Sequence, residues 1–417
     1  MNILWLSHLL PYPPIGGVAQ RSYHLIRELA RYHSVDLLSF NQKDIIPTPD
    51  GLQDAINHFA TFCTDVTAVA IPCDASRWGK PALIARSLLT RDPYTINWLK
   101  SVEMETALRS RLSRADYDLV VFDTISLASY RHLVTGPKTI LDHHNIEADM
   151  MWRRAANEWN MAKKAYFAQE AVKLQIYEKR LCPTFDLHLT CSELDSQRLL
   201  RSSPELRTRT IPNPVDINYF SASTCAPQPN SIVFVGSMGW YPNREAMTRF
   251  AAQIWPALRA AIPDAKTTIV GSDPPPMLLD LAASDDRFMV TGFVDDARPH
   301  IARNAVYVCP ITNGGGTKLK ILDALAMGKA IVADPIACEG IDLVDGETVL
   351  YASNTGEYVT QIKRLFADEV LRHRLGKNGR KLIEEEYAVS KVGRMLAAAC
   401  EELVTSPHDE GLRRKYQ

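Results

Sequence analysis

The sequence predicts two doubly wound α/β domains, each built on a parallel β-sheet. Short apolar runs rich in Val, Ile and Leu alternate with amphipathic stretches along the whole 417-residue chain. Such runs, separated by helices, are typical of parallel strands that are buried on both faces. The length supports two domains, because one hydrophobic core rarely serves a chain of this size.

The expected strands follow one another at regular intervals. In the first half they cover residues 3–7, 34–40, 65–71, 117–123, 138–142 and 187–191. In the second half they cover residues 231–236, 266–271, 288–292, 306–310, 330–333 and 348–351. Parallel strands need crossover connections, and the amphipathic stretches between the runs supply these as helices.

A segment rich in Pro, Ser and Asn, residues 211–230, separates the two halves. We therefore expect an N-terminal domain of residues 1–213 and a C-terminal domain of residues 214–389. A last helix at about residues 390–410 is expected to pack back on the N-terminal domain. The final residues, 411–417, are expected to form a frayed polar tail.

Bulk properties exclude some classes of function. The net charge of −1 argues against a nucleic-acid-binding protein that relies on bulk positive charge. The eight cysteines form no CxxC pair and are expected to be buried, reduced thiols. The sequence shows neither a signal peptide nor an apolar stretch of transmembrane length. We expect a cytoplasmic protein, soluble or peripheral on the inner face of a membrane.

The most informative segment is a glycine-rich turn, residues 314–317, between an expected strand and an expected helix. Its glycines let a ligand approach the main chain, and the helix N-terminus adds partial positive charge. Lys318 is expected in the first helical turn, and Asp323 about one and a half turns later, where it can face the same site. This arrangement suits a diphosphate with a carboxylate for sugar hydroxyls. A glycine turn before a helix can also be only a tight connection.

Two further glycine-containing loops follow expected strands. They lie at residues 13–17 and 236–239. In open α/β sheets, ligands bind beyond the carboxyl ends of the strands. If the two domains face each other, all three loops line one cleft.

Together these segments resemble the retaining glycosyltransferases of the family 4 type (glycosyl transferases group 1). These enzymes have the GT-B fold, in which two Rossmann-like domains face each other across a cleft. The resemblance covers nearly the whole chain. It rests on the early glycine loop, on residues 211–216 and 234–243, and most strongly on residues 309–332. These motifs are specific for the family and not for any sugar.

The resemblance implies a nucleotide-diphosphate-sugar donor held mainly by the second domain. The residues expected to bind it are Gly16, Gly17, Ser237, Arg244, Val294, Gly315, Gly316, Thr317, Lys318 and Asp323. The resemblance implies that Ser237, Gly316, Thr317 and Lys318 hold the diphosphate. The aspartate stands where many members bind ribose hydroxyls with a glutamate, and the loop with Val294 would contact the nucleobase.

The chain departs from the family pattern at two places. Many members carry two glutamates separated by seven residues, and here Gly315 occupies the first position, so main-chain N–H groups are expected to replace that carboxylate. Many members also carry an arginine and a lysine where this chain has Ser237 and Asn243. We expect Lys318 to replace this charge, with Arg244 as the second choice.

The segment after the strand at 138–142 carries the candidate catalytic residues His143, His144, Asn145 and Glu147. A histidine there can hydrogen-bond the sugar or the acceptor, and the other two can orient an acceptor hydroxyl. The alternative is that this segment merely caps the next helix. Asp123 and His8 follow other strands and are weaker candidates. The chemistry needs no cofactor, and the absence of an Asp-x-Asp motif suggests no metal, because N–H groups and a lysine suit the diphosphate.

A basic, aromatic stretch is expected to form one long helix over residues 151–180. Its seven basic and three acidic residues give 7 − 3 = +4. Such a helix can lie on an anionic membrane, which would fit a lipid-linked acceptor. The alternative is an ordinary surface helix with its aromatic residues in the core.

The leading prediction is a metal-independent hexosyltransferase with retention of anomeric configuration. It would move a sugar to a glycan or lipid-linked saccharide in bacterial polysaccharide or glycoconjugate biosynthesis, without nucleic-acid partners. A sugar-nucleotide epimerase of the GT-B type and an inactive nucleotide-sugar-binding assembly subunit are the alternatives. The sequence leaves the base, the sugar, the acceptor, the linkage and the oligomeric state open.

Overall fold

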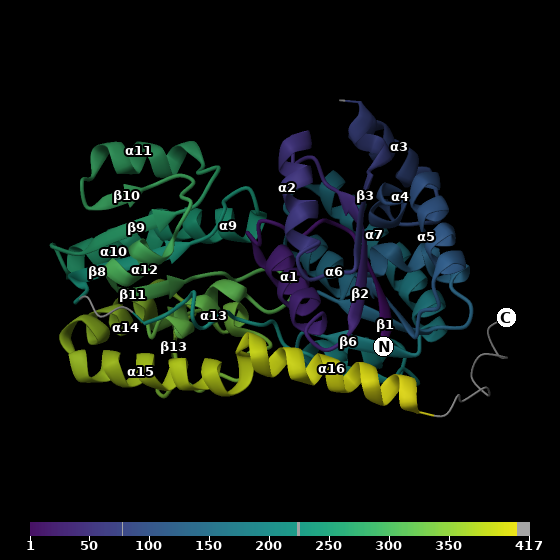
Figure 1. Cartoon of the computed structure of the whole chain (residues 1–417). Coiled ribbons are helices and arrows are strands. Elements are labelled where there is room, and N and C mark those ends of the chain that lie inside the picture. The colour runs from purple at the N-terminus through teal and green to yellow at the C-terminus, as the bar shows by residue number, and fades with distance from the viewer. Residues whose placement is uncertain (77, 223–225, 407–417) are drawn as a thin grey trace. The chain divides into compact units, whose positions relative to one another are not determined.

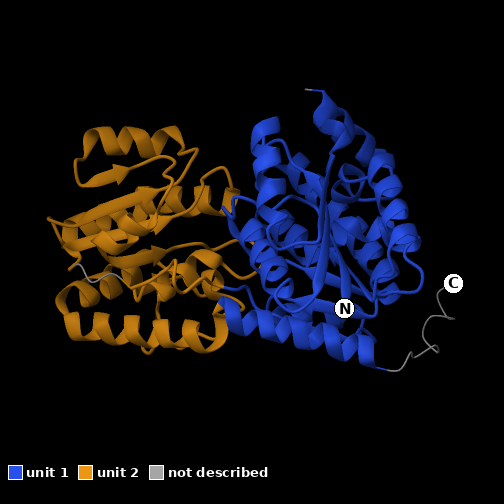
Figure 2. Ribbon diagram, in the orientation of Figure 1, with its two compact units in different colours: residues 1–214, 389–417 blue, residues 215–388 orange. Residues whose placement is uncertain are grey.

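The computed structural model describes residues 1–76, 78–222 and 226–406. The chain divides into two compact units (Figure 2). Unit 1 comprises Met1–Pro214 together with the chain from Val389 onward, and unit 2 comprises Val215–Ala388. These boundaries lie one residue from those predicted. Part of the predicted linker, with Cys225, and the predicted tail at 411–417 lie outside the described residues.

Unit 1 contains a seven-stranded parallel sheet in the order β3-β2-β1-β4-β5-β6-β7 (Figure 1). The order reverses between β1 and β4, where such sheets bind ligands. The strands are β1 (Asn2–Ser7), β2 (Ser34–Asn41), β3 (Asp65–Ala70), β4 (Leu119–Asp123), β5 (Lys138–His143), β6 (Leu187–Thr190) and β7 (Thr208–Thr210).

Side chains of successive strand residues point to opposite faces of this sheet, and each face has its own apolar core. Ile3 and Trp5 belong to one core, and Leu4 and Leu6 belong to the other. The covering helices are α1 (Gly17–Leu29), α2 (Pro49–Phe59), α3 (Gly79–Leu89), α4 (Tyr94–Trp98), α5 (Val102–Arg114), α6 (Glu147–Asn157), α7 (Met161–Leu181), α8 (Glu193–Ser202) and α16 (Val389–Thr405), with the 3₁₀ segments η1 (Pro72–Ala75), η2 (Ile125–Leu133) and η3 (Cys182–Thr184).

The prediction of one long helix over residues 151–180 is wrong. Two helices, α6 and α7, occupy this stretch. The break has a local cause, because the Asn160 side chain accepts hydrogen bonds from the N–H groups of Ala162 and Lys163, both at 3.1 Å. An asparagine in this position is a favoured N-cap, so α7 starts afresh after it.

Unit 2 contains a six-stranded parallel sheet in the order β10-β9-β8-β11-β12-β13. Its strands are β8 (Gln228–Val235), β9 (Lys266–Val270), β10 (Phe288–Val290), β11 (Asn304–Cys309), β12 (Ala330–Ala333) and β13 (Leu350–Tyr351). Its helical segments are α9 (Tyr241–Arg249), η4 (Phe250–Ile254), α10 (Trp255–Ala261), α11 (Pro276–Ser284), α12 (Arg298–Arg303), α13 (Leu319–Ala326), η5 (Pro335–Cys338), α14 (Thr355–Ala367), α15 (Glu369–Leu382) and η6 (Ile383–Tyr387). Every residue of its buried apolar cluster lies between Val215 and Tyr387.

Helix α16 returns the chain to unit 1 and packs against α1. Its residues Val392, Leu396 and Cys400 are fully buried in the same core as Ile3 and Trp5. The two helices approach closely at Gly393, where a Cβ atom would lie 2.5 Å from the Cβ of Glu28. The apolar face of α16 therefore completes the unit 1 core.

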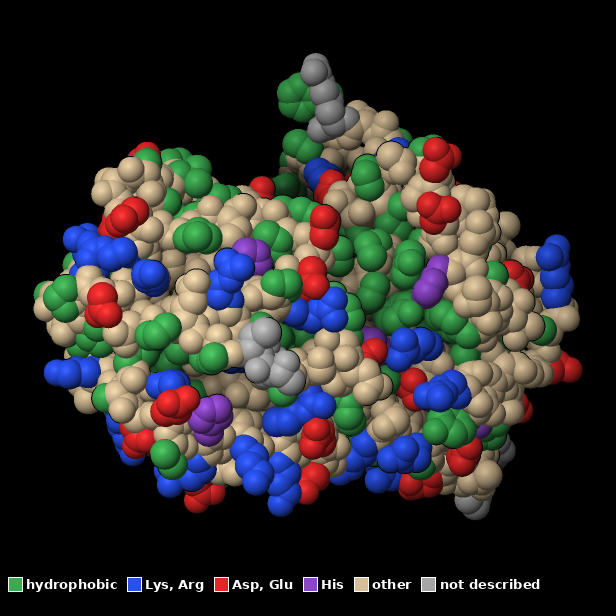
Figure 3. All heavy atoms as spheres, turned by 60° about the vertical axis from the view of Figure 1, so that its left-hand side comes forward, with side chains coloured by type: hydrophobic (Ala, Val, Ile, Leu, Met, Phe, Trp, Pro, Cys, Tyr) green, Lys and Arg blue, Asp and Glu red, His purple; other side chains and the backbone are tan. Residues whose placement is uncertain are grey.

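Within the described residues, no helix combines the length and the apolar character needed to cross a membrane. Most of the described cysteines are buried, Cys73 is partly exposed, and all are free thiols. Acidic and basic side chains are interspersed over the face drawn in Figure 3. This mixture agrees with the net charge of −1.

Candidate functional site

The carboxyl edge of the unit 2 sheet gathers most of the predicted donor-binding residues. The loops after β8, β9 and β10 are joined by main-chain hydrogen bonds from Gly236 to Val270 (2.8 Å) and from Gly271 to Gly292 (3.0 Å). The loop after β11 is the predicted glycine turn, and its Gly314 lies against α9, where a Cβ atom would be 3.1 Å from Cγ of Pro242. Ser237, Val294 and the glycine turn therefore share one edge of one sheet.

The sequence predicted Lys318 in the first turn of the helix, and this prediction is wrong. It is the N-cap residue of α13, it is almost fully buried, and its backbone is extended. Its Nζ atom donates hydrogen bonds to the carbonyl oxygens of Gly315 (2.7 Å) and Gly316 (2.8 Å). The ammonium group thus binds the underside of the glycine turn.

This clamp fixes the direction of the turn's N–H groups. In a planar trans peptide the C=O and N–H bonds point in opposite directions. Because the carbonyls of Gly315 and Gly316 point at Lys318, the N–H groups of Gly316 and Thr317 point away from it. Gly314 and Gly316 have φ values of 99° and 66°, which favour glycine. Consecutive N–H groups presented in this way form an anion-binding concavity.

Lys320 is the cation that the sequence interpretation missed. Its Nζ atom donates a hydrogen bond to Oδ1 of Asn243 and lies 4.7 Å from the centre of the Phe234 ring and 5.7 Å from that of Trp240. A Cβ atom on Gly236 would lie only 2.5 Å from this Nζ atom. Glycine at 236 therefore makes room for the ammonium group beside the loop after β8.

The position of Lys320 also explains its ionisation. Burial lowers the pKa of Lys320 to about 8, although Asp323 on the same helix face opposes the shift. Asn243, in turn, donates to the main-chain carbonyl of Ser237 at 2.7 Å. The lysine is thus connected to the Ser237 loop through one amide side chain.

Asp323 and Thr317 present buried polar atoms that make no hydrogen bond. These atoms are Oδ1 of Asp323 and Oγ1 of Thr317. Burial raises the pKa of Asp323 to about 8, with Lys320 acting against the shift. These two unpaired atoms belong to the glycine turn and to the helix that follows it, so they are available to a polar ligand at this edge of the sheet.

The other predicted donor residues differ in their surroundings. The Ser237 hydroxyl accepts a hydrogen bond from Ser272 at 2.8 Å and is exposed. Val294 is half-buried and packs against the unit 2 core. Arg244 lies on α9 with an exposed side chain.

In unit 1, the early glycine loop lies at the N-terminus of α1. Gly16 has a φ of 84° and is the N-cap residue of the helix, and Gly17 is its first residue. Both are exposed, and a Cβ atom on Gly16 would meet nothing within 4 Å. The loop therefore leaves open space above a helix N-terminus, which suits an anionic group.

A buried cluster of four charged groups lies at the carboxyl edge of the same sheet. Arg21 binds Asp142 through two hydrogen bonds of 3.0 and 2.6 Å. His144 forms a short ion pair with Asp123 and lies 3.3 Å from Asp142. Ser7 and Ser22 each donate to Asp123 at 2.8 Å. Two carboxylates therefore face one guanidinium and one imidazole.

This cluster fixes the charge of His144. Burial alone would lower the pKa of His144, but Asp123 and Asp142 outweigh it and raise the pKa to about 9. The imidazole is protonated at neutral pH and acts as a hydrogen-bond donor and not as a base. The ring of His8 stands edge-on to it at 5.6 Å. The two weaker candidates, Asp123 and His8, thus lie beside His144.

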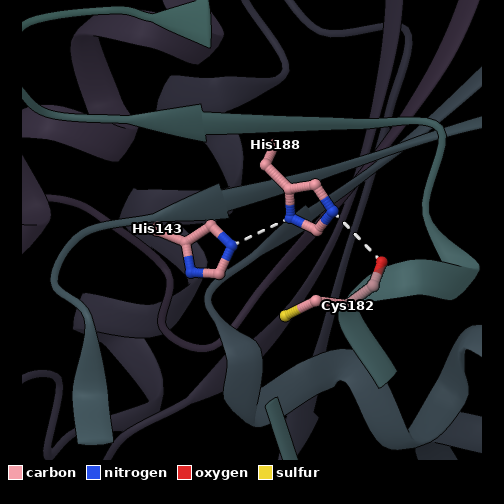
Figure 4. A group of neighbouring side chains, drawn as sticks. All are labelled: His143, Cys182 and His188. Atoms are coloured by element: carbon pink, nitrogen blue, oxygen red, sulfur yellow. Dashed lines mark hydrogen bonds between the residues drawn. The ribbon is translucent and has the colours of Figure 1, made fainter. Parts of the chain in front are cut away.

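His143 faces the opposite side of the sheet, as alternation along β5 requires. Its Nε2 atom lies 3.0 Å from Nδ1 of His188, whose Nε2 atom donates to the Cys182 carbonyl at 3.1 Å (Figure 4). Burial lowers the pKa of His143 to about 4. Its side chain lies in the interior of unit 1, away from His144.

Asn145 and Glu147 follow at the start of α6. The carboxyl group of Glu147 is hydrogen-bonded by the Asn145 side chain, and burial raises its pKa to about 7. A carboxyl group with this pKa can exchange a proton near neutral pH. The helix has Ile146 at its N-cap position, and the N–H of Ala148 in its first turn donates to Glu178 of α7, so neither Asp142 nor Asn145 caps it.

Two clusters in the described residues have the composition of a metal site. They are His143 with Cys182 and His188, and Asp123 with Asp142 and His144. In the first, the two histidines already bind each other and a main-chain carbonyl. In the second, Arg21 and the protonated His144 neutralise both carboxylates. Internal hydrogen bonds and ion pairs therefore account for both groups.

Comparison with known proteins follows the same two-unit division. Residues 15–219 match the family model described as Glycosyltransferase Family 4, and residues 229–368 match the one described as Glycosyl transferases group 1. An "Uncharacterized 44.6 kDa protein in cps region" of Klebsiella pneumoniae is 22% identical over 315 residues, which are 70% of this chain and 78% of that protein.

Solved structures share the fold at low identity. The sucrose-phosphate synthase of Thermosynechococcus elongatus gives a TM-score of 0.71 at 16% identity, covering 97% of this chain and 99% of its own. HepE of Anabaena, solved in complex with UDP, gives a TM-score of 0.64 at 15% identity, covering 96% of this chain and 100% of its own.

Proposed function

The chain is a glycosyltransferase of the GT-B type, and we propose that it transfers a hexosyl group from a nucleotide-diphosphate sugar to a glycan or lipid-linked acceptor with retention of anomeric configuration. The proposal is carried by one observation, the placement of Lys320 beside Gly236 in the loop after β8, at the sheet edge that also carries the glycine turn. A related fold has been solved with UDP bound, which supports a nucleotide-sugar donor here.

The donor diphosphate would lie between the N–H groups of the glycine turn and the ammonium group of Lys320. Breaking the sugar–phosphate bond leaves negative charge on the diphosphate, and fixed donors stabilise that charge without moving. Thr317 and Asp323 would turn their unbonded polar atoms to hydroxyls of the ribose or the sugar. Val294 stands at the same edge, where main-chain groups would meet the base.

We propose that no metal ion or cofactor takes part, because the lysine and the N–H groups supply the positive charge that the leaving group requires. Retention would place the acceptor on the face that the diphosphate vacates. The new bond forms between the acceptor oxygen and the anomeric carbon, and the old bond to the phosphate oxygen breaks. The acceptor proton passes to the departing phosphate.

In unit 1, His144 and Glu147 would bind the acceptor. His144 donates a hydrogen bond as a cation, and Glu147 accepts or donates according to its protonation. The relative in a cps region supports a glycan or lipid-linked acceptor. We therefore place the reaction in polysaccharide or glycoconjugate biosynthesis in the cytoplasm.

The test compares two buried lysines of unit 2. Donor binding would be measured by calorimetry for UDP-, GDP-, ADP-, CMP- and dTDP-sugars with the wild type, Lys320→Met and Lys329→Met. Lys329 is a matched control, because its Nζ atom donates to the carbonyls of Ala302 and Asn304 and its pKa is also lowered to about 8. It precedes β12, so it lies at the opposite edge of the sheet.

We expect one nucleotide class to bind and Lys320→Met to weaken it about 10- to 100-fold, the range of a charge-assisted hydrogen bond of about 1.5–3 kcal/mol. Lys329→Met should leave the affinity unchanged. Equal losses in both variants would mean that the effect is structural and would contradict the proposal. If the protein converted the sugar of the donor into its epimer with no acceptor present, it would instead be an epimerase.

A further inference from the structure

Helix α7 exposes a row of apolar side chains on its outer face. Met161, Val172 and Ile176 are exposed, and Ala165 lies between them. Ala165, Val172 and Ile176 stand four, eleven and fifteen residues after Met161. This spacing places all four side chains on one side of the helix. The opposite side of α7 is buried through Phe167, so the row is not the side that packs on unit 1.

The end of α3 extends this row. Gln169 of α7 donates to the Leu88 carbonyl at 3.0 Å, and Lys173 donates to the Ser87 carbonyl at 2.6 Å. These bonds hold Leu88 and Leu89 beside the exposed face of α7. Leu89 is 91% exposed, so its isobutyl group lies almost wholly in solvent.

An exposed tryptophan lies just before the start of α7. Trp159 is 95% exposed, two residues before Met161. A single exposed apolar residue needs no explanation, but a contiguous group marks an interaction surface. We call this group, comprising Leu88, Leu89, Trp159, Met161, Val172 and Ile176, the α3–α7 face.

The charges around this face are mainly basic, although the partly exposed Glu158 precedes Trp159 and accepts a hydrogen bond from the N–H of Asn160 at 2.9 Å. Helix α7 has two carboxylates, and both turn inward. Glu170 accepts from the N–H of Tyr94 at 2.6 Å, and Glu178 accepts from the N–H of Ala148 at 3.1 Å. Helix α3 contains no acidic residue. The exposed charged residues of the two helices are basic. Lys179 stands eighteen residues after Met161, on the side of the row, and Arg86 stands three residues before Leu89 on α3.

We propose that the α3–α7 face binds an anionic lipid bilayer. Exposed Trp, Leu, Met and Ile enter the boundary between headgroups and acyl chains, and basic side chains around them attract anionic headgroups. An apolar surface for a second protein copy would not require the two carboxylates to be withdrawn. The inference concerns the surface of unit 1 alone and does not rest on the proposed transfer reaction.

The test is sedimentation of the full chain with lipid vesicles, without donor or acceptor. One set of vesicles is phosphatidylcholine, and the other is an equal mixture with phosphatidylglycerol. The wild type is compared with Leu89→Glu, Ile176→Glu and Arg86→Glu/Lys179→Glu. Val370→Glu is the matched control, because Val370 is 80% exposed but lies on α15 of unit 2.

We expect the wild type to bind the anionic vesicles and to be released by salt. Each of the three face variants should reduce binding at least about tenfold, because an apolar anchor is lost or headgroup attraction is reversed. Val370→Glu should bind as the wild type does, and unchanged thermal midpoints would show that all variants fold.

Two results would overturn the proposal. One is absence of binding to either kind of vesicle, or binding that the face variants leave intact. The other is a concentration-dependent dimer in light scattering that Leu89→Glu abolishes, since the face would then bind a second copy. Either result would leave donor binding in unit 2 unaffected, so this inference and the proposed function fail independently.

Discussion

Lys318 and Lys320 stand two residues apart and have different surroundings. The sequence favoured Lys318 as the cation of the site, with Arg244 as the second choice, and assigned no role to Lys320. The structure turns Lys318 beneath the turn and directs Lys320 to the loop after β8. The direction depends on where α13 begins, and helix ends are the least certain part of a sequence-based prediction. Lys320 stands three residues before Asp323, so both lie on one face of the helix. This spacing was the signal in the sequence that could have identified Lys320.

The candidate residues of unit 1 illustrate a second limit. Strand alternation could have separated His143 from its neighbours Asp142 and His144, because a strand sends successive side chains to opposite faces. The partners of His144 could not be predicted in this way. Asp123 and Arg21 are distant in the sequence, and only the parallel order of β1, β4 and β5 brings them together.

Donor affinity should fall at alkaline pH. Lys320 has a pKa lowered to about 8, so it loses its positive charge as the pH rises through 8. Asp323 has a pKa raised to about 8 and gains negative charge in the same interval. Both changes weaken the attraction of the site for a negatively charged diphosphate. We expect the affinity to be nearly constant between about pH 6 and 7 and to fall above about pH 8.

A double variant provides the control for this pH dependence. Lys320→Arg/Asp323→Asn has neither titrating group, because arginine stays protonated and asparagine does not ionise. Calorimetric titrations from about pH 6 to 9 should give a flat profile for this variant. A fall of the same size in both proteins would show that other groups, or the donor itself, control the affinity.

Asp323 should also make the folded state less stable as the pH rises. Its pKa is raised from 3.8 to about 8 by burial, so the folded protein retains a proton that the unfolded chain has already lost. The stability from this group is present below about pH 4 and is lost as the pH rises to 8. Asp323→Asn should therefore gain thermal stability relative to the wild type between pH 5 and 8.

Scanning calorimetry would measure this difference at each pH. A change of 1 kcal/mol shifts the midpoint of a domain of this size by about 2–4 °C. The gain should grow with pH and then level off above about pH 8, where the wild-type carboxyl is fully charged. A gain that does not depend on pH would mean that the carboxyl is already ionised in the folded protein.

At the scale of elements, the strand prediction succeeded because buried parallel strands are continuous apolar runs. The predicted strand at 330–333 matches β12, and the others differ from the structure by a few residues at their ends. β7 was not predicted. Its residues Thr208–Thr210 form a short polar edge strand without an apolar pattern. The break between α6 and α7 was also missed, because the basic and aromatic residues continue across it while a single asparagine ends the run.

Close packing between elements gives a sharp test at Gly376. This residue lies in α15, where a Cβ atom would be 2.0 Å from the carbonyl oxygen of Gly328. The neighbour is main chain, so it cannot move aside as a flexible side chain would. Gly376→Ala should therefore lower the stability of unit 2 by about 1–3 kcal/mol or more, as overpacked sites do.

Gly356 is the matched control for this substitution. It lies in α14, it is exposed, and a Cβ atom there would be 3.5 Å from Oδ1 of Asn354, an ordinary contact. Gly356→Ala should raise the stability by up to about 1 kcal/mol, because alanine favours the helix. Urea unfolding of both variants would measure the difference. Equal behaviour of the two would mean that α15 can move away from Gly328.

At the scale of the whole molecule, the chain does not finish one unit before it starts the next. It builds the sheet of unit 1, continues through unit 2, and returns with α16 to complete the unit 1 core. Unit 2 has no such dependence, because its apolar cluster lies entirely between Val215 and Tyr387. The two units should therefore respond differently to the loss of the C-terminal segment.

A chain that ends at Ala388 should lose the stability of unit 1 and keep that of unit 2. The truncation removes Val392, Leu396 and Cys400 and uncovers the apolar face of α1 on which they pack. Each lost apolar side chain of this kind costs about 2–5 kcal/mol. The sum is comparable to the whole stability of a typical domain, about 5–15 kcal/mol. Hydrogen exchange followed by mass spectrometry would report both units in one experiment. Peptides of unit 1 should lose their protection, while those of unit 2 retain it, and a control chain ending at residue 406 should behave as the full chain does. Retained protection in unit 1 would mean that its sheet and remaining helices form a sufficient core without α16.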